Sequence, residues 1–114
     1  MAGSYYIHRT SANEVMIAPD TWDYRTPIIP TKIVECDFDS TFVIARQQEL
    51  RRRSPADPGD QYMEPTPGKY HYWILDVRLP QVYGPLNSGE FAEQRERLKV
   101  PTQLTLKDVY LFRP

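Results

Sequence analysis

The side chains that could carry out chemistry are few in this chain, and they lie far apart in the sequence. There are two histidines, His8 and His71, and one cysteine, Cys36. A zinc site needs clustered cysteine and histidine ligands, and a hydrolase triad needs a nucleophile beside a histidine. The five glycines form no phosphate-binding GxxxxGK or GxGxxG pattern. We therefore expect no catalytic residues, no metal site and no cofactor, and we interpret both histidines as structural.

Cys36 lies between two carboxylates, Glu35 and Asp37. Neighbouring negative charge raises the pKa of a thiol and so lowers its reactivity. A single cysteine also cannot form a disulfide within the chain. We expect a half-buried structural thiol at this position.

Three carboxylates, Glu35, Asp37 and Asp39, alternate along the chain at the end of a predicted strand. Alternate residues of a strand point to the same face of a sheet, so these carboxylates should form an acidic patch. Calcium requires more oxygen ligands than these three residues supply. We predict that the patch binds a basic surface of a protein partner. The alternative is that the charges only keep an exposed strand soluble.

Aromatic residues are abundant, with two Trp, eight Tyr and four Phe. A domain of this size cannot bury them all, and exposed Tyr and Trp side chains are typical of binding surfaces. Trp22 and Tyr24 lie in a connection, residues 21–30, that also contains two prolines. We predict that both aromatic residues contribute, with the acidic patch, to a surface that binds a partner.

The overall composition limits the classes of function. The chain has 114 residues, 14 Lys and Arg against 15 Asp and Glu, and a net charge of −1. This balance gives no basic footprint for nucleic acid, and no apolar run reaches the ~20 residues of a membrane-spanning helix. The first residues lack the basic and apolar regions of a signal peptide. We expect one domain over residues 1–114, cytoplasmic as the sequence is written, or in the cell envelope if an upstream signal or lipid anchor was removed.

The alternation of apolar and polar residues predicts an α+β fold with an antiparallel sheet of about five to seven strands. One helix is expected near residues 88–99, because Asn87 or Ser88 can cap it and Glu90 favours its first turn. Along residues 41–45, successive side chains should face opposite sides of the sheet. The expected strands are residues 5–10, 15–18, 33–37, 41–45, 70–77 and 82–83, with a last edge strand from residues 104–106 and 109–112.

Residues 51–69 interrupt this pattern. The segment holds four of the eleven prolines and few apolar side chains. Few burial contacts would protect such a segment, so we expect a flexible, exposed, proline-rich loop that proteases cleave first.

Three short motifs follow one another in the second half of the chain. They are YWILD at residues 72–76, VYGPL at 82–86 and EF at 90–91. With these motifs the chain resembles a family of small uncharacterised bacterial domains, many of which look like secreted lipoproteins. The resemblance implies a small β-rich domain with one helix, and it supplies no catalytic residues.

The absence of a catalytic motif and the aromatic-rich strands favour a non-catalytic protein-binding module over an enzyme. One form of such a module is an immunity-type inhibitor of a bacterial toxin. The alternatives are a small enzyme with an unrecognised active site and a lipoprotein-type surface domain. The expected partner is a protein rather than a nucleic acid.

Overall fold

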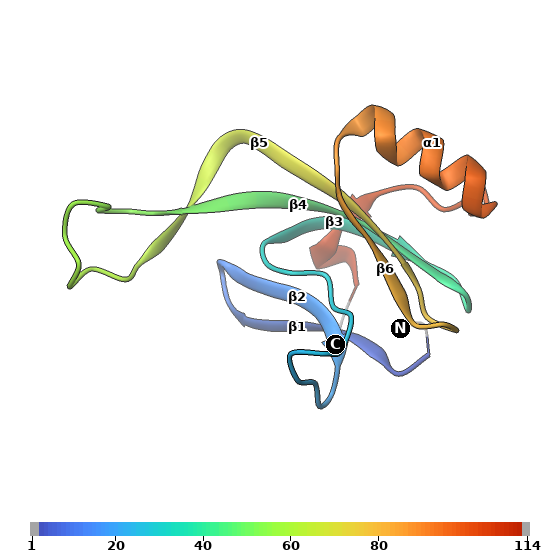
Figure 1. Ribbon diagram of the computed structural model, residues 1–114, viewed down its shortest axis with the longest axis horizontal. Coiled ribbons are helices and arrows are strands. Elements are labelled where there is room, and N and C mark those ends of the chain that lie inside the picture. The colour runs from blue at the N-terminus through green and yellow to red at the C-terminus, as the bar shows by residue number, and fades with distance from the viewer. Residues whose placement is uncertain (1–2, 113–114) are drawn as a thin grey trace.

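Two β-sheets and one α-helix form three layers in the computed structural model, which describes residues 3–112 (Figure 1). The first layer is a hairpin of β1 (Tyr5–Ser11) and β2 (Glu14–Pro19). The middle layer is a five-stranded antiparallel sheet, and α1 (Ser88–Leu98) covers the face of that sheet opposite the hairpin. The prediction of a single α+β domain is confirmed.

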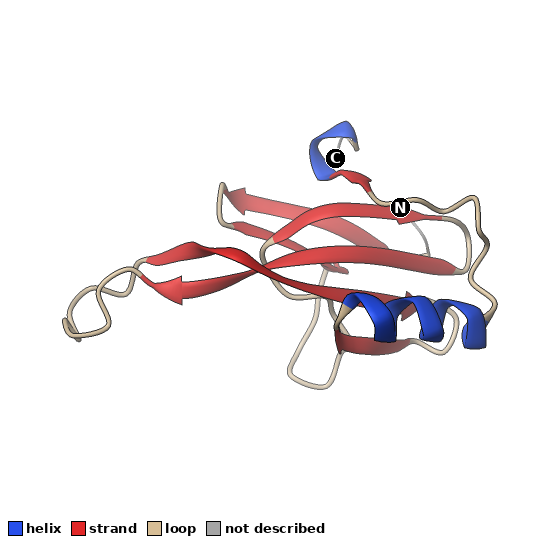
Figure 2. Cartoon of the chain, turned by 90° about the horizontal axis from the view of Figure 1, so that it is seen from above, coloured by secondary structure: helices blue, strands red, loops and turns tan. Residues whose placement is uncertain are grey.

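The five strands of the middle layer are arranged in the order β6-β5-β4-β3-β7 (Figure 2). Neighbouring strands pair antiparallel, and the chain passes from β3 to β6 through connections between adjacent strands. After α1, the chain returns to the opposite edge, where β7 pairs with β3. The strands are β3 (Ile33–Phe38), β4 (Phe42–Arg52), β5 (Met63–Asp76), β6 (Gln81–Leu86) and the two-residue β7 (Lys107–Asp108).

The two faces of the central strand belong to two different cores. Along β4, Phe42 and Ile44 pack toward α1, whereas Val43 and Ala45 pack toward the hairpin. This alternation is the one that the sequence predicts, and both faces are buried because a layer covers each of them. The hairpin-side core also contains Tyr5, Val15, Ile17, Ile29, Ile33, Cys36, Leu75 and Val109, and the helix-side core also contains Ile74, Phe91, Val100 and Leu104.

Beyond the body of the sheet, β4 and β5 continue as a two-stranded arm, residues 49–66, which projects to the left in Figure 1. β3 pairs with β4 only as far as Gln47, and β6 pairs with β5 only as far as Tyr72. In the arm the two strands therefore have only each other as ladder partners. Their register joins Leu50, Arg51 and Arg52 to Pro65, Glu64 and Met63, respectively.

The predicted loop at residues 51–69 is wrong in its extent. Arg51 and Arg52 belong to β4, and residues 63–69 belong to β5, so only residues 53–62 connect the strands. Proline is tolerated in a strand with a free edge, because its missing N–H then costs no ladder hydrogen bond. Pro65 and Pro67 lie in such a strand, which explains why a proline count alone suggested a loop.

The predicted helix begins at a capping box. The Asn87 side chain accepts a hydrogen bond from the Glu90 backbone N–H at 2.8 Å, and the Glu90 carboxylate accepts one from the Asn87 N–H at 2.9 Å. Phe91 then packs into the helix-side core. Among residues 3–112, no helix is both long and apolar enough to cross a membrane.

The predicted edge strand at residues 104–106 and 109–112 is wrong, because this part of the chain pairs with β3 only at β7, which lies between these two segments. Leu104 is buried in the helix-side core rather than paired in a ladder. After β7, the Asp108 side chain accepts a hydrogen bond from the Tyr110 N–H and begins a short 3-10 helix, η1 (Val109–Leu111). An aspartate that caps a helix in this way ends the strand, because it turns the backbone out of the extended conformation.

Candidate functional site

All three carboxylates predicted to form an acidic patch are occupied by contacts within the chain. Glu35 Oε1 lies 3.0 Å from Arg46 Nη1, and this guanidinium lies 3.8 Å from the centroid of the Tyr70 ring. Asp39 accepts two hydrogen bonds, both at 2.8 Å, from backbone N–H groups of the turn that follows it. These contacts fix the β3–β4 hairpin, and they leave Glu35 and Asp39 less free for a partner than the sequence suggests.

Asp37 is buried, with 7% of the residue exposed. Its carboxylate accepts hydrogen bonds from Lys107 Nζ at 2.6 Å and from the backbone N–H groups of Thr105 and Phe38, each at 2.9 Å. Burial acts to raise the pKa of this carboxyl, but the three hydrogen bonds and the charge of Lys107 outweigh burial, so the pKa is lowered. Asp37 thus ties the segment around β7 to β3, which fits a structural role.

The predicted partner-binding residues do not form one surface. Glu35 and Asp37 lie on the α1 side of the five-stranded sheet, because they pair with β4 residues that face α1. Trp22 packs against His8, with 5.1 Å between ring centroids, on the outer face of the hairpin. Tyr24 is 94% exposed in the same connection. The acidic and the aromatic members are therefore separated by two layers of the fold.

The thiol of Cys36 is fully buried in the hairpin-side core. Burial, and after it the charge of Asp37, raises the pKa of this thiol to about 12. The thiol is more deeply buried than the half-buried position that we expected, and its raised pKa fits a structural role. Within residues 3–112, no three His, Cys, Asp or Glu side chains are grouped as metal ligands.

A groove that the sequence did not predict lies between the hairpin and the arm. It consists of two adjoining hollows of about 490 and 480 Å³, which share the lining residues Thr31, Leu50 and Met63. The first hollow follows the β1–β2 turn, and the second runs beneath the sheet toward β6. The first is also lined by Ser11, Ala12, Asn13, Glu14, Met16, Gln61 and Tyr62, and the second by Gln47, Glu49, His71, Trp73 and Pro85.

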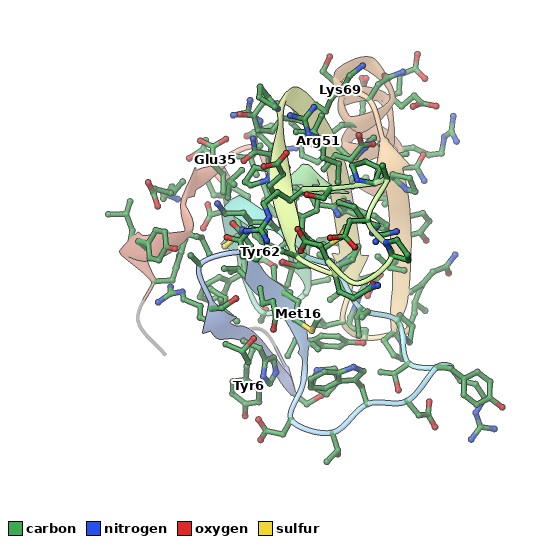
Figure 3. All side chains as sticks on the ribbon, turned by 90° about the vertical axis from the view of Figure 1, so that its left-hand side faces the viewer. Tyr6, Met16, Glu35, Arg51, Tyr62 and Lys69 are labelled. Atoms are coloured by element: carbon green, nitrogen blue, oxygen red, sulfur yellow. The ribbon has the colours of Figure 1, made fainter. Side chains whose placement is uncertain are left out.

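Figure 3 looks at the molecule from the tip of the arm. Tyr62 lies at about mid-height in this view and Met16 lies below it, on the hairpin, whereas Arg51 and Lys69 lie higher. The groove lies between Met16 on the hairpin and Tyr62 on the arm.

A chain of side-chain hydrogen bonds forms the floor of the groove. Trp73 Nε1–H donates to Gln47 Oε1, and Gln47 Nε2–H donates to the Thr31 carbonyl, both at 2.6 Å. Thr31 Oγ1–H donates to the Asn13 carbonyl at 2.6 Å, and Asn13 Nδ2–H donates to the Met63 carbonyl at 3.2 Å. The chain of bonds starts on β5, crosses β4 and the β1–β2 turn, and returns to β5 in the arm. It fixes the separation of hairpin and arm.

The walls of the groove are apolar and accessible. Leu50 and Met16 are half-buried, Met63 is 38% exposed and Tyr62 is 52% exposed. A concave surface with exposed apolar side chains is the usual mark of a binding site. Methionine side chains are unbranched and flexible, so they adapt to different bound shapes.

The turn at the end of the arm, residues 53–62, is held by its own polar contacts. Arg53 donates two hydrogen bonds to Asp60 Oδ2, at 3.0 Å from Nε and 2.8 Å from Nη2. The same guanidinium lies 4.7 Å from the centroid of the Tyr62 ring. Arg52 donates to the carbonyls of Asp57 and Asp60, at 2.7 and 2.9 Å. These contacts hold Tyr62 at the edge of the groove.

The sequence contained one signal for this groove. Leu50 and Met63 are apolar residues that bracket a polar, turn-forming segment, which is typical of a hairpin. The prolines between residues 55 and 67 outweighed that signal and favoured a loop. Without the hairpin, nothing places Leu50 and Met63 opposite the turn of the N-terminal hairpin.

Comparison with known proteins gives a family and no function. The family model described as "Protein of unknown function (DUF3997)" matches residues 2–110. No curated protein and no solved structure shows significant similarity to the chain. The match spans nearly the whole chain, groove and arm included, and it confirms the resemblance to a family of uncharacterised domains. The chain therefore belongs to the DUF3997 family of proteins of unknown function.

Proposed function

We propose that this chain is a non-catalytic protein-binding module that holds a segment of its partner in the groove between hairpin and arm. The observation that carries the proposal is the apolar, accessible groove whose floor is fixed by the hydrogen-bond chain from Trp73 to Met63. A groove that is already formed loses little conformational entropy on binding, so more of the contact energy appears as affinity.

A protein segment suits this groove better than a small molecule does. Small-molecule sites bury most of their ligand in a concave cavity. Here two wall residues, Tyr62 and Met63, are each more than a third exposed, so the groove is open along the arm. Tyrosine and methionine are also enriched in protein interfaces.

An immunity-type inhibitor of a bacterial toxin is one form that this module can take. It would use the same groove, and it would protect cells from its toxin. Loss of protection in variants of the groove, with normal amounts of folded protein, would identify this form.

The test is affinity capture of partners from cells of the source organism, compared between two matched variants. Met63→Asp places a charge on the groove wall. Leu79→Asp makes the same type of change at a residue that is 63% exposed outside the groove lining. We expect Met63→Asp to reduce capture of the partner at least tenfold and Leu79→Asp to leave it unchanged. Equal capture by the two variants would contradict the proposal.

A second pair of matched variants keeps the proposal testable if Met63→Asp fails to fold. Tyr62 and Tyr110 are both exposed, and each has an arginine guanidinium near its ring, Arg53 at 4.7 Å and Arg9 at 5.2 Å. Tyr62→Ala should weaken capture several-fold, because it removes an aromatic contact from the groove. Tyr110→Ala removes a similar side chain elsewhere and should have no effect on capture.

A further inference from the structure

The groove has a charge bias that the rest of the arm does not share. Its lining residues include two carboxylates, Glu14 and Glu49, and no lysine or arginine. The arginines of the arm are engaged outside the lining. Arg51 Nε donates to Glu64 at 3.2 Å, Arg52 donates to carbonyls of the terminal turn, and Arg53 pairs with Asp60.

Glu49 is placed to receive a cation from a bound segment. Its side chain is 47% exposed in the second hollow, and one of its oxygens, Oε1, lies 3.2 Å from His71 Nε2. A carboxylate offers about four acceptor positions, so this single contact leaves capacity for a further hydrogen bond. A Lys or Arg that approaches along the groove would meet this free capacity.

Glu14 extends the acidic character to the other end of the groove. Its Oε2 accepts a hydrogen bond from Thr10 Oγ1 at 2.6 Å, and the residue is otherwise exposed at the β1–β2 turn. Leu50 and Met63 line both hollows and so lie between the two carboxylates. The groove thus presents an apolar centre with negative charge toward both ends.

The arm is poorly suited to recognition by strand pairing. Pro65 and Pro67 remove two backbone N–H donors from the β5 side of the arm. Proline on an exposed strand is a common protection against pairing with another chain. Recognition in the groove must therefore come mainly from side chains.

Resting on the proposed function, we infer that the occupant of the groove is an extended peptide segment in which a Lys or Arg lies beside large apolar side chains. The apolar side chains contact Leu50, Met63 and Tyr62, and the cation pairs with Glu49. Charge complementarity of this kind speeds association and makes it sensitive to salt.

The experiment is selection of a displayed library of random peptides of about twelve residues on the 114-residue chain. Such a peptide is about 40 Å long in extended form. We expect the selected peptides to carry Lys or Arg next to Leu, Ile, Met or Phe. A synthetic copy of a selected peptide should bind Glu49→Gln about tenfold more weakly than wild type, since a charge-assisted hydrogen bond is lost. Glu93→Gln removes the same charge from the exposed side of α1 and should bind like wild type.

Salt provides an independent measurement on the same peptide. Raising the salt concentration from about 0.1 to 0.5 M should weaken binding to wild type and have a smaller effect on Glu49→Gln, because screening acts on the charge pair. Selected peptides that are acidic or uncharged, or affinity that is equal for wild type and Glu49→Gln, would overturn the inference.

The two proposals fail in different ways. Peptides that lose binding with Met63→Asp but contain no cation would overturn the inference about charge and would support the groove as a binding site. If peptides and native partners bind Met63→Asp as well as wild type, the groove is not the binding site and the proposed function is wrong.

Discussion

The body of the sheet and the arm are built from the same two strands, but different surroundings cover their faces. In the body, Ile44 of β4 and Ile74 of β5 are fully buried beneath α1. In the arm, Leu50 is half-buried and Met63 is 38% exposed. Burial of apolar surface contributes roughly 25 cal/mol per Å², so the body supplies most of the stability and the arm supplies accessible apolar surface.

The comparison teaches how a small domain can present accessible apolar surface on paired strands rather than on a loop. Backbone pairing of β4 with β5 continues to Arg52 and Met63, and the Arg53 N–H still donates to the Tyr62 carbonyl at 2.9 Å. The buried part of each strand therefore sets the position of the exposed part. The hydrogen-bond chain through Gln47 adds a second support beneath the arm.

The largest loss of folding stability is expected for a substitution in the body of the sheet. Ile74→Ala removes a fully buried side chain from the helix-side core, so it should lower the free energy of unfolding by about 2–5 kcal/mol. Urea denaturation followed by circular dichroism measures this loss. Leu50→Ala, in the half-buried arm, serves as the comparison and should cost clearly less. Equal losses for the two variants would mean that the arm belongs to the same core as the body.

The second-largest loss of stability is expected on substitution of Asp37, whose contribution to stability also depends on pH. Asp37→Ala should cost about 1–3 kcal/mol, because the backbone N–H of Thr105 and the ammonium of Lys107 lose their buried acceptor. The pKa of Asp37 is lower in the folded than in the unfolded chain. Its stabilising contribution is therefore present above the pKa of the unfolded carboxyl and is lost as the pH falls through the folded pKa.

The measurement is the urea midpoint of wild type and Asp37→Asn between neutral pH and about pH 3, below the ordinary pKa of aspartate. Wild type should lose stability over the acidic part of this range more steeply than Asp37→Asn. Asp20→Asn changes an exposed aspartate and should keep the wild-type slope. Parallel curves for wild type and Asp37→Asn would show that the carboxylate is not stabilised by folding.

Substitution of Gln47 tests whether the hydrogen-bond chain beneath the groove stabilises the arm. Gln47→Ala removes the acceptor of the Trp73 indole N–H and the donor to the Thr31 carbonyl, so it should cost about 1–2 kcal/mol. The emission of Trp73, measured in a Trp22→Phe background, should shift to longer wavelength as water reaches the indole. An unchanged spectrum and midpoint would show that the floor of the groove does not depend on this chain of bonds.

Much of the body could be predicted from the sequence, because its signals are local. The alternation at residues 42–45 indicates two buried faces, and the Asn87 to Glu90 spacing indicates the start of α1. Neither needs knowledge of distant contacts. The pattern around Leu104 predicts a strand and misses its burial, because that burial depends on packing beneath α1, which adjacent residues do not reveal.

The candidate site could not be predicted, because it depends on contacts between segments far apart in the chain. Asn13 reaches the Met63 carbonyl across 50 positions, and Gln47 reaches Thr31 across 16. Spacing also placed Asp37 in an exposed patch, since the pattern of carboxylates does not show that Lys107 and Thr105 arrive from 70 and 68 positions away. Sequence periodicity reports the face of a strand, but not what covers that face.

The smallest effect on global stability, and the most local one, is expected at the tip of the arm. The strands there pair only with each other, so local opening should cost less free energy than global unfolding, and trypsin should cut first at Arg52 or Arg53. Asp60→Ala removes both hydrogen bonds from Arg53 and should speed this first cut several-fold, with the urea midpoint nearly unchanged. Asp20→Ala, an exposed aspartate outside the arm, should leave the rate unchanged. A first cut in the body, identified by mass spectrometry, would show that the arm is no less stable than the layers that support it.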